Sequence, residues 1–509
     1  MTLSTARQFR SGLKACAIPF MAALVWGCGD AVVDTVEDAP VADAIIRGVT
    51  VVSVDDGTAV ISDVVISDGV IQDVRLAQSE PADRAVLDID GRGKYLIPGL
   101  ADMHVHLAEP WGPRGRKEMD VFPEDEAQAI ADEMFLYLAN GVTLVRNMDG
   151  WPLHLELRDR IRSGEIDGPE IVTSGPIIYG PGAGALYPDE ASAPGAWVAS
   201  AEEARSVVDA HLDAGFDFIK VYNSMPPEAY AALIDQAHAR GAKVAGHIAF
   251  DVGVYGALEA GQDSIAHLRG YDIPPASENI DLMSPERFAY WLRISDGTMA
   301  DFARATKDSG TYNAPTLAVA DAFSYFLTDD PAGASPGYKY MSAQMRDYHS
   351  QFVLFSRAAI EATLATIPPI HRMLNALHTE GAGLMAGTDT PIYYLVPGFA
   401  LHTELENYVE AGFSEAEALR IATVNPMTYL GRETQRGRIQ AGHEADLVLL
   451  NADPLSDIRN TRDIAGVMSD GRWFDRAEID SRLDGIASRA AVADTDSSQD
   501  DPEAEGQEP

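Results

Sequence analysis

The sequence predicts an α/β fold: a (β/α)8 TIM barrel with a small β-sandwich domain formed from both ends of the chain. Three observations predict it. The chain has 509 residues, enough for one large domain and a smaller one. In the middle of the chain, short apolar runs alternate with helical stretches, which is typical of βαβ units around a parallel sheet. The segments on both sides of this centre are rich in Val and Ile and contain Asp-Gly turns, which is typical of hairpins.

The β-sandwich is expected over residues 44–97 and 432–478. The first segment has β-branched runs interrupted by Asp56-Gly57 and Asp68-Gly69, and the second contains the similar stretches GRIQAGHEADLVLLNADP and GVMSDGRWF. Because the two segments have the same β-rich texture and lie on both sides of the α/β centre, we expect both to contribute strands to one domain.

The barrel is expected over residues 98–431. Eight segments have the apolar, β-branched composition of its strands: Leu96–His106, Thr143–Asp149, Glu170–Pro176, Phe218–Tyr222, Lys243–Ala249, Ser264–Leu268, Asn313–Val319 and Gly383–Asp389. Helices fit between them. One starts near Ser224 and stops at Gly241, and another begins with a capping box at Ser414 and ends at Asn425-Pro426. The long stretches 269–310 and 320–370 are expected to form helical insertions over the barrel mouth.

Residues 1–27 are predicted to be an export signal of the bacterial lipoprotein type. Three basic residues precede an apolar run, Ala15 to Trp26, that is short for a transmembrane helix. The run leads to Cys28, as in a lipobox, although Trp26 stands where a small residue is usual. We therefore expect an exported protein of the periplasm or the outer membrane, anchored by a lipid at Cys28. An ordinary cleaved signal or an uncleaved anchor are the alternatives. Residues 28–43 are expected to be an acidic tether.

The charge of the chain limits its partners. The net charge of −40 repels nucleic acid, so a polynucleotide substrate is not expected. Residues 479–509 are expected to be an acidic disordered tail. The two cysteines, Cys16 and Cys28, both lie in the predicted leader, so the folded body has no disulfide. The sequence leaves open whether the protein forms a homo-oligomer.

Residue types that bind metals gather at the ends of the predicted barrel strands, where TIM-barrel active sites lie. They are His104 and His106 on the first strand, Lys220 and Tyr222 on the fourth, His247 on the fifth, His267 on the sixth and Asp389 on the eighth. Because strand side chains alternate, each pair on one strand points to the same side. Singly, each residue also has a structural reading: a core histidine, a lysine paired with a carboxylate, or an aspartate that caps a turn. Their joint occurrence at one end of the barrel favours a metal site.

At these residues the sequence resembles the amidohydrolase superfamily, in particular its prolidase-like and imidazolonepropionase-related members. The matching stretches include YLIPGLADMHVHL, FDFIKVY, VAGHIAF, SIAHL and AGTDTP, and the resemblance covers roughly residues 44–475. It implies a metal-dependent hydrolase of carbon–nitrogen bonds with a binuclear centre. Zn²⁺ is the usual occupant, and nitrogen and oxygen ligands leave Mn²⁺, Fe²⁺ and Co²⁺ open.

The resemblance also implies the ligands of each ion. His104, His106 and Asp389 hold the first, His247 and His267 the second, and N6-carboxylated Lys220 bridges both. The two ions activate a water molecule, and Asp389 takes its proton and later passes it to the leaving amine.

The substrate is expected to be a small molecule, such as a dipeptide or an N-acyl amino acid. Tyr222 is a candidate to stabilise a tetrahedral oxyanion, and packing at the barrel rim is its alternative. Arg146 and Arg269 are candidates to bind a substrate carboxylate, and the alternative for each is a structural ion pair. Hydrolysis of a lactone, ester or organophosphate on the same metals is the runner-up. A catalytically inactive surface binding protein is a third reading.

Overall fold

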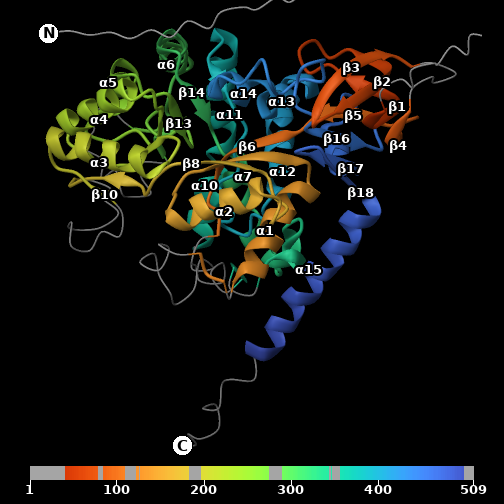
Figure 1. Ribbon diagram of the computed structural model, residues 1–509. Coiled ribbons are helices and arrows are strands. Elements are labelled where there is room, and N and C mark those ends of the chain that lie inside the picture. The colour runs from red at the N-terminus through yellow and green to blue at the C-terminus, as the bar shows by residue number, and fades with distance from the viewer. Residues whose placement is uncertain are drawn as a thin grey trace, which may run out of the picture.

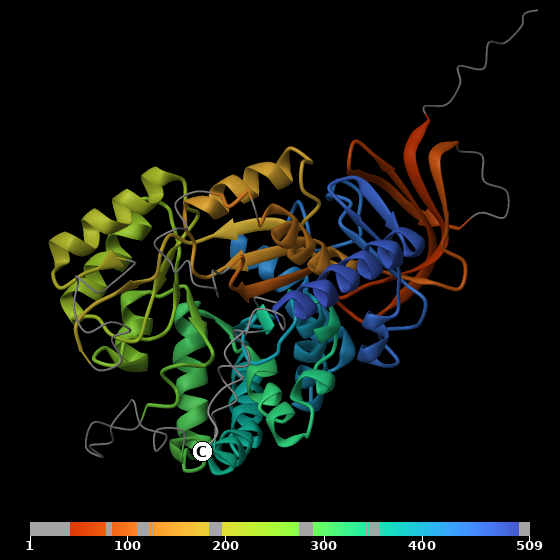
Figure 2. The ribbon, with the colours of Figure 1, turned by 90° about the horizontal axis from the view of Figure 1, so that it is seen from below.

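The computed structural model of the protein describes residues 41–77, 84–108, 122–124, 126–182, 196–273, 289–342, 345–346 and 356–497. The predicted leader and its cysteines lie outside these residues. Within them, no helix is both long and apolar enough to cross a membrane. The chain forms a TIM-barrel-like α/β part and a sheet domain that lies beside it, and the helices α3 to α5 lie at the opposite end (Figure 1, Figure 2).

Each of the eight predicted barrel segments overlaps an observed strand. The strands are β6 Leu100–Val105, β7 Val142–Asn147, β8 Glu170–Thr173, β11 Ile219–Val221, β12 Val244–Gly246, β13 Ser264–Ala266, β14 Tyr312–Ala314 and β15 Gly383–Leu384. They pair in parallel, in two groups: β6-β7-β8, and β11 to β15 with the short strands β9 Ile178–Tyr179 and β10 Ala196–Trp197 beside β11. Single parallel bridges, Ser174 with Phe218 and Val105 with Thr390, connect the two groups at both ends.

Two predicted segments include part of another element besides their barrel strand. The first predicted segment begins at Leu96, but Tyr95–Pro98 is β5 of the sheet domain, and only the residues after Gly99 enter the barrel. A side chain at Gly99 would lie 2.2 Å from the Thr143 hydroxyl, so the chain passes between the two parts where only glycine fits. The seventh segment was expected to reach Val319, but helix α7 already begins at Leu317.

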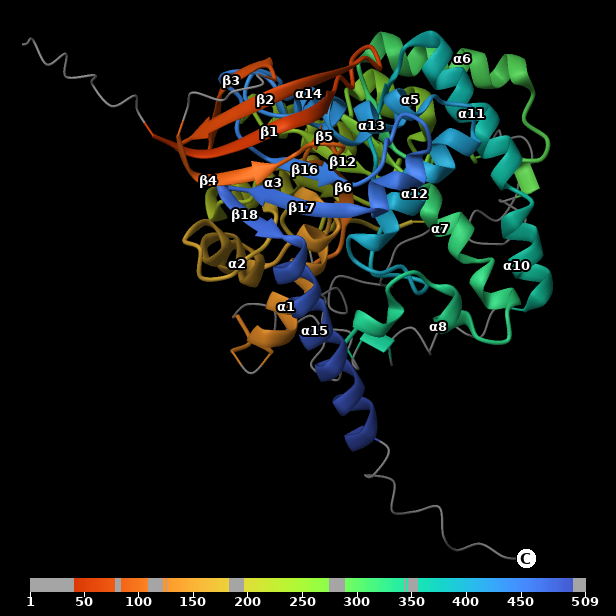
Figure 3. The same ribbon diagram turned by 90° about the vertical axis from the view of Figure 1, so that its right-hand side faces the viewer.

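Helices follow the parallel strands. They are α1 Ala127–Ala139, α2 Pro152–Arg162, α3 Ala201–Ala214, α4 Pro227–Ala239, α5 Gly253–Ala260, α6 Asp296–Ser309, α7 Leu317–Ala322, α8 Pro331–Ala334, α10 Arg357–Leu364, α11 Ile367–Glu380, α12 Phe399–Glu410, α13 Glu415–Ala422 and α14 Val424–Leu430. The capping box predicted at Ser414 starts α13. This helix ends at Ala422, earlier than expected, and the predicted end at Asn425-Pro426 lies inside the next helix, α14. Between β14 and β15 the helices α7, α8 and α10 form an insertion beside the barrel (Figure 3).

The sheet domain contains strands from both ends of the chain, as predicted. Its strands are β1 Ala42–Val52, β2 Ala59–Ser67, β3 Val70–Leu76, β4 Ala85–Asp90, β5 Tyr95–Pro98, β16 Leu447–Leu450, β17 Ile464–Ser469 and β18 Arg472–Asp475. They form one eight-stranded sheet in the order β18-β17-β16-β5-β1-β2-β3, with β4 also paired to β1, in place of two separate sheets. Side chains from both ends of this sheet, such as Ile71 and Met468, share one core, so the sheet folds over on itself.

The C-terminal segment differs from the prediction. Residues 479–497, expected to be disordered, belong to helix α15 Arg476–Ser497, which extends from the sheet domain past α1 (Figure 1). Ile479, Leu483, Ile486 and Ala490 are buried and follow one another at helical spacing, so they form an apolar stripe. This stripe anchors the helix, and the acidic residues beyond it do not prevent helix formation. The end of the tail, residues 498–509, lies outside the described residues.

Candidate metal centre

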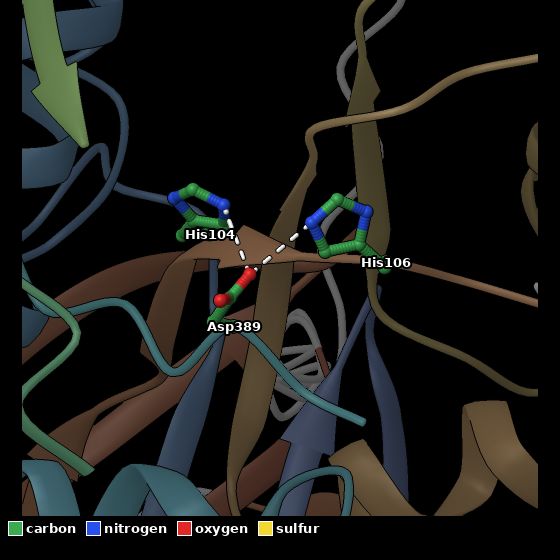
Figure 4. Close-up of side chains that lie close together, drawn as sticks. All are labelled: His104, His106 and Asp389. Atoms are coloured by element: carbon green, nitrogen blue, oxygen red, sulfur yellow. Dashed lines mark ion pairs between the residues drawn. The ribbon is translucent and has the colours of Figure 1, made fainter. Parts of the chain in front are cut away.

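Two histidines of β6 and an aspartate that follows β15 meet at the carboxyl ends of their strands (Figure 4). The Nε2 atoms of His104 and His106 each lie 3.2 Å from Oδ1 of Asp389. The ligand atoms of the three residues all lie within 4.8 Å of one another. The two imidazoles point to the same side of the strand, as the alternation of side chains predicted. Two imidazole nitrogens and a carboxylate oxygen that converge in this way form a set that divalent transition metals prefer.

The backbone around this group adopts rare conformations. Asp389 has a φ of 61°, in the left-handed region. A side chain at Gly387, two residues before Asp389, would lie 2.8 Å from His104 Cβ. Among the described residues, nine non-glycine residues have positive φ, and seven of them lie just after β6, β13, β14 or β15: Ala108, His267, Leu268, Thr316, Asp389, Tyr393 and Tyr394. Such strain costs free energy and is typical of functional sites. It is concentrated here at the end of the barrel that carries the metal-ligand residues.

His247 and His267 stand next to the first group. The His267 ring lies 4.4 Å from the His104 ring and 4.9 Å from the His247 ring, between centroids. Nδ1 of His247 lies 2.5 Å from Oδ1 of Asn223, and Nδ1 of His267 lies 2.7 Å from the hydroxyl oxygen of Thr316. An imidazole that donates from Nδ1 keeps its lone pair on Nε2, which is the usual state of a metal-bound histidine. The contacts with Asn223 and Thr316 therefore fix the orientation of these two rings.

Lys220 is enclosed among the same residues. Its side chain is 1% exposed, and burial lowers the pKa of its ammonium to about 7, although the charge of Asp389 opposes this. The neighbouring strand makes room for it, because a side chain at Gly246 would lie 3.0 Å from Lys220 Cδ. About half of the amine is therefore neutral at pH 7, and the neutral form is the one that reacts as a nucleophile.

The protonation states suit metal binding. Burial and the charge of Lys220 hold the pKa values of His104 and His247 well below the usual range, and burial lowers that of His267 to about 3. Burial raises the pKa of Asp389, but the surrounding imidazoles outweigh it and hold that pKa well below its usual value. The site thus presents neutral imidazoles and an ionised carboxylate, the states that ligate metals. Neither ring nitrogen of the fully buried His104 has a hydrogen-bond partner of good geometry in the described structure, and its Nε2 is the one that faces Asp389.

A second carboxylate, which the sequence interpretation did not assign, supports the first. Asp102 is fully buried and accepts hydrogen bonds from the Thr388 hydroxyl at 2.6 Å, the Thr388 backbone N–H at 3.0 Å and the His104 backbone N–H at 3.3 Å. Thr388 immediately precedes Asp389, so Asp102 ties the strand that carries the two histidines to the segment that carries Asp389. An acidic residue inside the apolar stretch YLIPGLADMHVHL was the available signal for it.

The three candidates for substrate contacts lie in different surroundings. The Tyr222 ring stacks on His247, with centroids 4.3 Å apart, so Tyr222 borders the metal-ligand group. Arg269 is half-buried, lies 3.4 Å from Asp272, and its charge lowers the pKa values of His247 and His267. Arg146 does not reach the mouth. It is 1% exposed, its Nε donates to the Met103 carbonyl at 2.7 Å, and its guanidinium lies over the rings of Phe218 and Tyr429.

The position of Arg146 follows from the packing of the barrel interior. Below the metal-ligand residues, the interior is filled by apolar side chains that include Met103, Phe218, Met385 and Tyr429. Arg146 lies in this layer, where a carboxylate of a substrate cannot reach it. We therefore exclude it from the candidate substrate contacts, because depth in the barrel separates it from Tyr222 and Arg269.

Comparisons with known proteins agree with this geometry. The model of the amidohydrolase family matches residues 95–474. Ochratoxinase from Aspergillus niger is 23% identical over 405 residues, which cover 72% of each chain. A solved structure of a Bifidobacterium longum protein assigned as a prolidase is 27% identical, with a TM-score of 0.61, and the match covers 88% of this chain and 100% of the other. The solved bottromycin amidohydrolase has a TM-score of 0.67 at 23% identity, over 88% and 90% of the two chains.

Proposed function

The chain belongs to the amidohydrolase family, and from that premise we propose that it is a binuclear metal-dependent hydrolase of amide bonds in N-acyl amino acids or dipeptides. The observation that carries the proposal is the convergence of His104, His106 and Asp389 within 4.8 Å, beside a buried lysine and two further histidines. The same premise favours a closed (β/α)8 barrel, which the bridges at Ser174 and Val105 support.

The residues of the site fit two divalent ions. His104, His106 and Asp389 would hold one ion, and His247 and His267 the other, with Zn²⁺ the expected occupant. Neutral imidazoles, an ionised carboxylate and the buried Nε2 of His104, which has no hydrogen-bond partner of good geometry among the described residues, support this assignment. When bound, the ions would supply Lewis-acid activation of water and of the scissile carbonyl.

Lys220 is proposed to bridge the two ions as an N6-carboxylated side chain. The amine attacks the carbon of CO₂, a new N–C bond forms, and one proton leaves, which turns a neutral group into an anion. Its enclosure beside the histidines and its pKa of about 7 support the neutral amine that this step requires. An ammonium at this position would repel bound cations, whereas the carbamate offers them two oxygen ligands.

The carbamate has a direct test. In Lys220→Ala we expect metal content and activity to collapse and to recover in part when a short carboxylic acid fills the gap. A carbamate carbon resonance after incubation with ¹³C-bicarbonate would support the modification independently of activity. Unmodified Lys220 in active, metal-loaded enzyme would sink the proposal.

Asp389 is proposed to move the proton. Its Oδ1 lies 3.2 Å from Nε2 of His104 and of His106, and its low pKa keeps it ionised, the form that can accept a proton from water and pass it to the leaving amine. Tyr222 would donate a hydrogen bond to the oxyanion of the substrate. Asp389→Asn should retain part of the metal and lose at least ~10²-fold in turnover, the lower end for general acid–base catalysis. Near-normal turnover would exclude this role.

Several observations support a small amide substrate with a carboxylate. Two of the similar proteins are named as a prolidase and an amidohydrolase, and both names denote amide hydrolysis. Arg269 offers a cation near His247 and His267 that is suited to a carboxylate. The test is a hydrolysis screen of dipeptides, N-acyl amino acids, lactones and organophosphates with metal-loaded protein. Faster cleavage of esters, lactones or organophosphates than of every amide would contradict the proposal.

We also propose that the protein is exported and held at the membrane by a lipid at Cys28. The basic residues and apolar run before Cys28 support it. Since all proposed ligands lie between His104 and Asp389, the body released from this anchor should retain activity.

A further inference from the structure

The short helix after β14 has an unusual N-terminus. Helix α7 begins at Leu317, and its N-cap residue is Thr316, which has a φ of 52° in the left-handed region. A threonine at an N-cap usually accepts, through its hydroxyl, a hydrogen bond from a backbone N–H of the first helical turn. Within the described residues, the Thr316 side chain makes no such bond. Its hydroxyl oxygen lies instead 2.7 Å from Nδ1 of His267, so the usual capping group of this helix contacts a candidate metal ligand.

A glutamate from another helix takes over the cap. Oε2 of Glu404, on α12, accepts a hydrogen bond from the backbone N–H of Ala318 at 2.8 Å. Ala318 is the second residue of α7, and a helix cannot satisfy the N–H of that position internally. Both residues are fully buried, so this N–H needs a partner from the protein. Glu404 thus satisfies the donor that the Thr316 hydroxyl leaves.

Helix α12 holds Glu404 in place between two other parts of the structure. On one side α12 lies next to α7, with which it shares an apolar cluster (Figure 3). Toward the sheet domain, Nδ1 of His402 lies 2.9 Å from the hydroxyl oxygen of Thr461, and Glu406 accepts a hydrogen bond from Arg462 at 2.8 Å. Both of these partners lie just before β17. The carboxylate that caps α7 is therefore carried by a helix that is fixed on both sides.

We propose that Glu404 is a positioning residue for His267, a predicted ligand of the second metal ion. Because Glu404 caps α7, the Thr316 hydroxyl is left to accept the Nδ1 proton of His267, and Nε2 keeps its lone pair for a metal ion. Without Glu404, the Thr316 hydroxyl turns to the Ala318 N–H, as at an ordinary N-cap, and releases the ring. The inference rests on the proposed function, because His267 binds the second ion only in a binuclear centre.

Three substitutions and one control test the links. Glu404→Leu removes the acceptor, and Glu404→Gln keeps one acceptor oxygen for the Ala318 N–H. Burial raises the pKa of Glu404 well above its usual range, so the neutral amide resembles the protonated carboxyl. Thr316→Val removes only the hydroxyl. The matched control is Ser200→Ala, because Ser200 accepts the Glu203 N–H at 3.3 Å as the N-cap of α3, away from the metal-ligand residues.

The first measurement is the affinity for each of two Zn²⁺ ions, by competition with a chelator. In Glu404→Leu and in Thr316→Val we expect one ion to bind at least ~10-fold more weakly, the lower end for the loss of an outer partner of a metal ligand, and the other to bind as in wild type. Glu404→Gln and Ser200→Ala should match wild type. The double variant should lose no more than Thr316→Val alone, because Glu404 acts through that hydroxyl.

Two results would overturn the positioning role. One is wild-type affinity for both ions in Glu404→Leu, and the other is additive losses in the double variant. If Glu404→Leu does not fold, Glu404→Asp takes its place, since it withdraws the carboxylate from the Ala318 N–H by one methylene. The same two results in Glu404→Asp would overturn the role equally.

A measurement on the metal-free protein separates this inference from the proposed function. ¹⁵N NMR of histidine-labelled protein reports which ring nitrogen of His267 carries the proton, and the His267→Gln variant assigns the signals. We expect the proton on Nδ1 in wild type and Glu404→Gln, and both tautomers in Glu404→Leu. A wild-type proton on Nε2, or unchanged signals in Glu404→Leu, would overturn the inference and leave the binuclear centre standing. A tautomer that depends on Glu404, in a protein that binds one ion only, would support the inference and count against the proposed centre.

Discussion

Removal of the Asp102 carboxylate tests whether second-layer hydrogen bonds hold the metal ligands in place. In Asp102→Ala, the backbone N–H of His104 loses its acceptor, whereas the Thr388 N–H keeps the His104 carbonyl at 3.2 Å and the Thr388 hydroxyl keeps the Thr390 hydroxyl at 3.1 Å. A buried donor left without a partner costs about 1–3 kcal/mol, so we expect the free energy of unfolding to fall by an amount in this range. The protein should still fold, because domains commonly have about 5–15 kcal/mol to lose.

The expected effect on metal binding is larger than stability alone explains. Asp102 connects the strand of His104 and His106 to the residue before Asp389, so its loss lets the two sides of the first ligand set move apart. Loss of such outer partners typically lowers metal affinity by ~10–100-fold, and we expect a change of that order in Asp102→Ala. Asp102→Asn keeps one acceptor oxygen and should lie between this variant and wild type.

The assay pairs urea unfolding of the metal-free proteins with competition between each protein and a chelator for Zn²⁺. The matched control is Asp63→Ala in the sheet domain. Asp63 is also buried and accepts the backbone N–H of Gly48 at 2.8 Å. Both variants should be less stable than wild type, but only Asp102→Ala should bind metal more weakly. Equal metal affinity in the two variants would refute the reasoning, because Asp102 would then contribute to stability alone.

Three further predictions concern other parts of the chain. Burial lowers the pKa of His211 to about 4, from 6.5, so its contribution to stability is complete above pH 6.5 and is lost as pH falls toward 4; the shift is worth about 3 kcal/mol. Urea unfolding of His211→Gln across this range should show a correspondingly weaker loss of stability toward acid pH, and an unchanged pH profile would contradict it. Leu483→Ala in α15 should lower the free energy of unfolding by about 2 kcal/mol, since its side chain is buried in the main core; a wild-type unfolding curve would show that α15 does not stabilise the body. Cys28→Ala should move the protein from the membrane fraction to the soluble fraction on cell fractionation, and a wild-type protein without an acyl chain by mass spectrometry would end the anchor hypothesis.

Local sequence pattern accounts for much of the fold. Runs of β-branched residues and their spacing by helical stretches located all eight parallel strands, because strand and helix periods are properties of short segments. The contribution of both chain ends to one sheet domain followed from their shared composition. The prediction of a disordered tail was wrong for residues 479–497. It gave more weight to the acidic composition of this segment than to the apolar stripe of Ile479, Leu483 and Ile486. That stripe becomes stabilising only because the body presents a surface that covers it.

The metal-ligand residues belong to the part of the site that the sequence alone determined. His104, His106, Lys220, His247, His267 and Asp389 stand at strand ends, and parallel strands bring those ends together whatever the details of packing. The side to which each residue points follows from alternation along its own strand. The structure brings these six together in one group, and the metals and the carbamate remain proposals that the experiments above address.

The tertiary structure decided how deep each side chain lies in the barrel and which distant residues it contacts. Arg146 faces the barrel interior, but it lies among Phe218 and Tyr429 below the site, because the height of a side chain depends on the stagger between strands. Asp102 meets Thr388 across 286 positions of the chain, and Tyr393 meets Phe323 only through the packing of two separate segments. The periodicity of a strand specifies only to which side of that strand each side chain points. Contacts between segments depend on how far each strand is shifted against its neighbours, and that shift is set by the packing of the whole barrel.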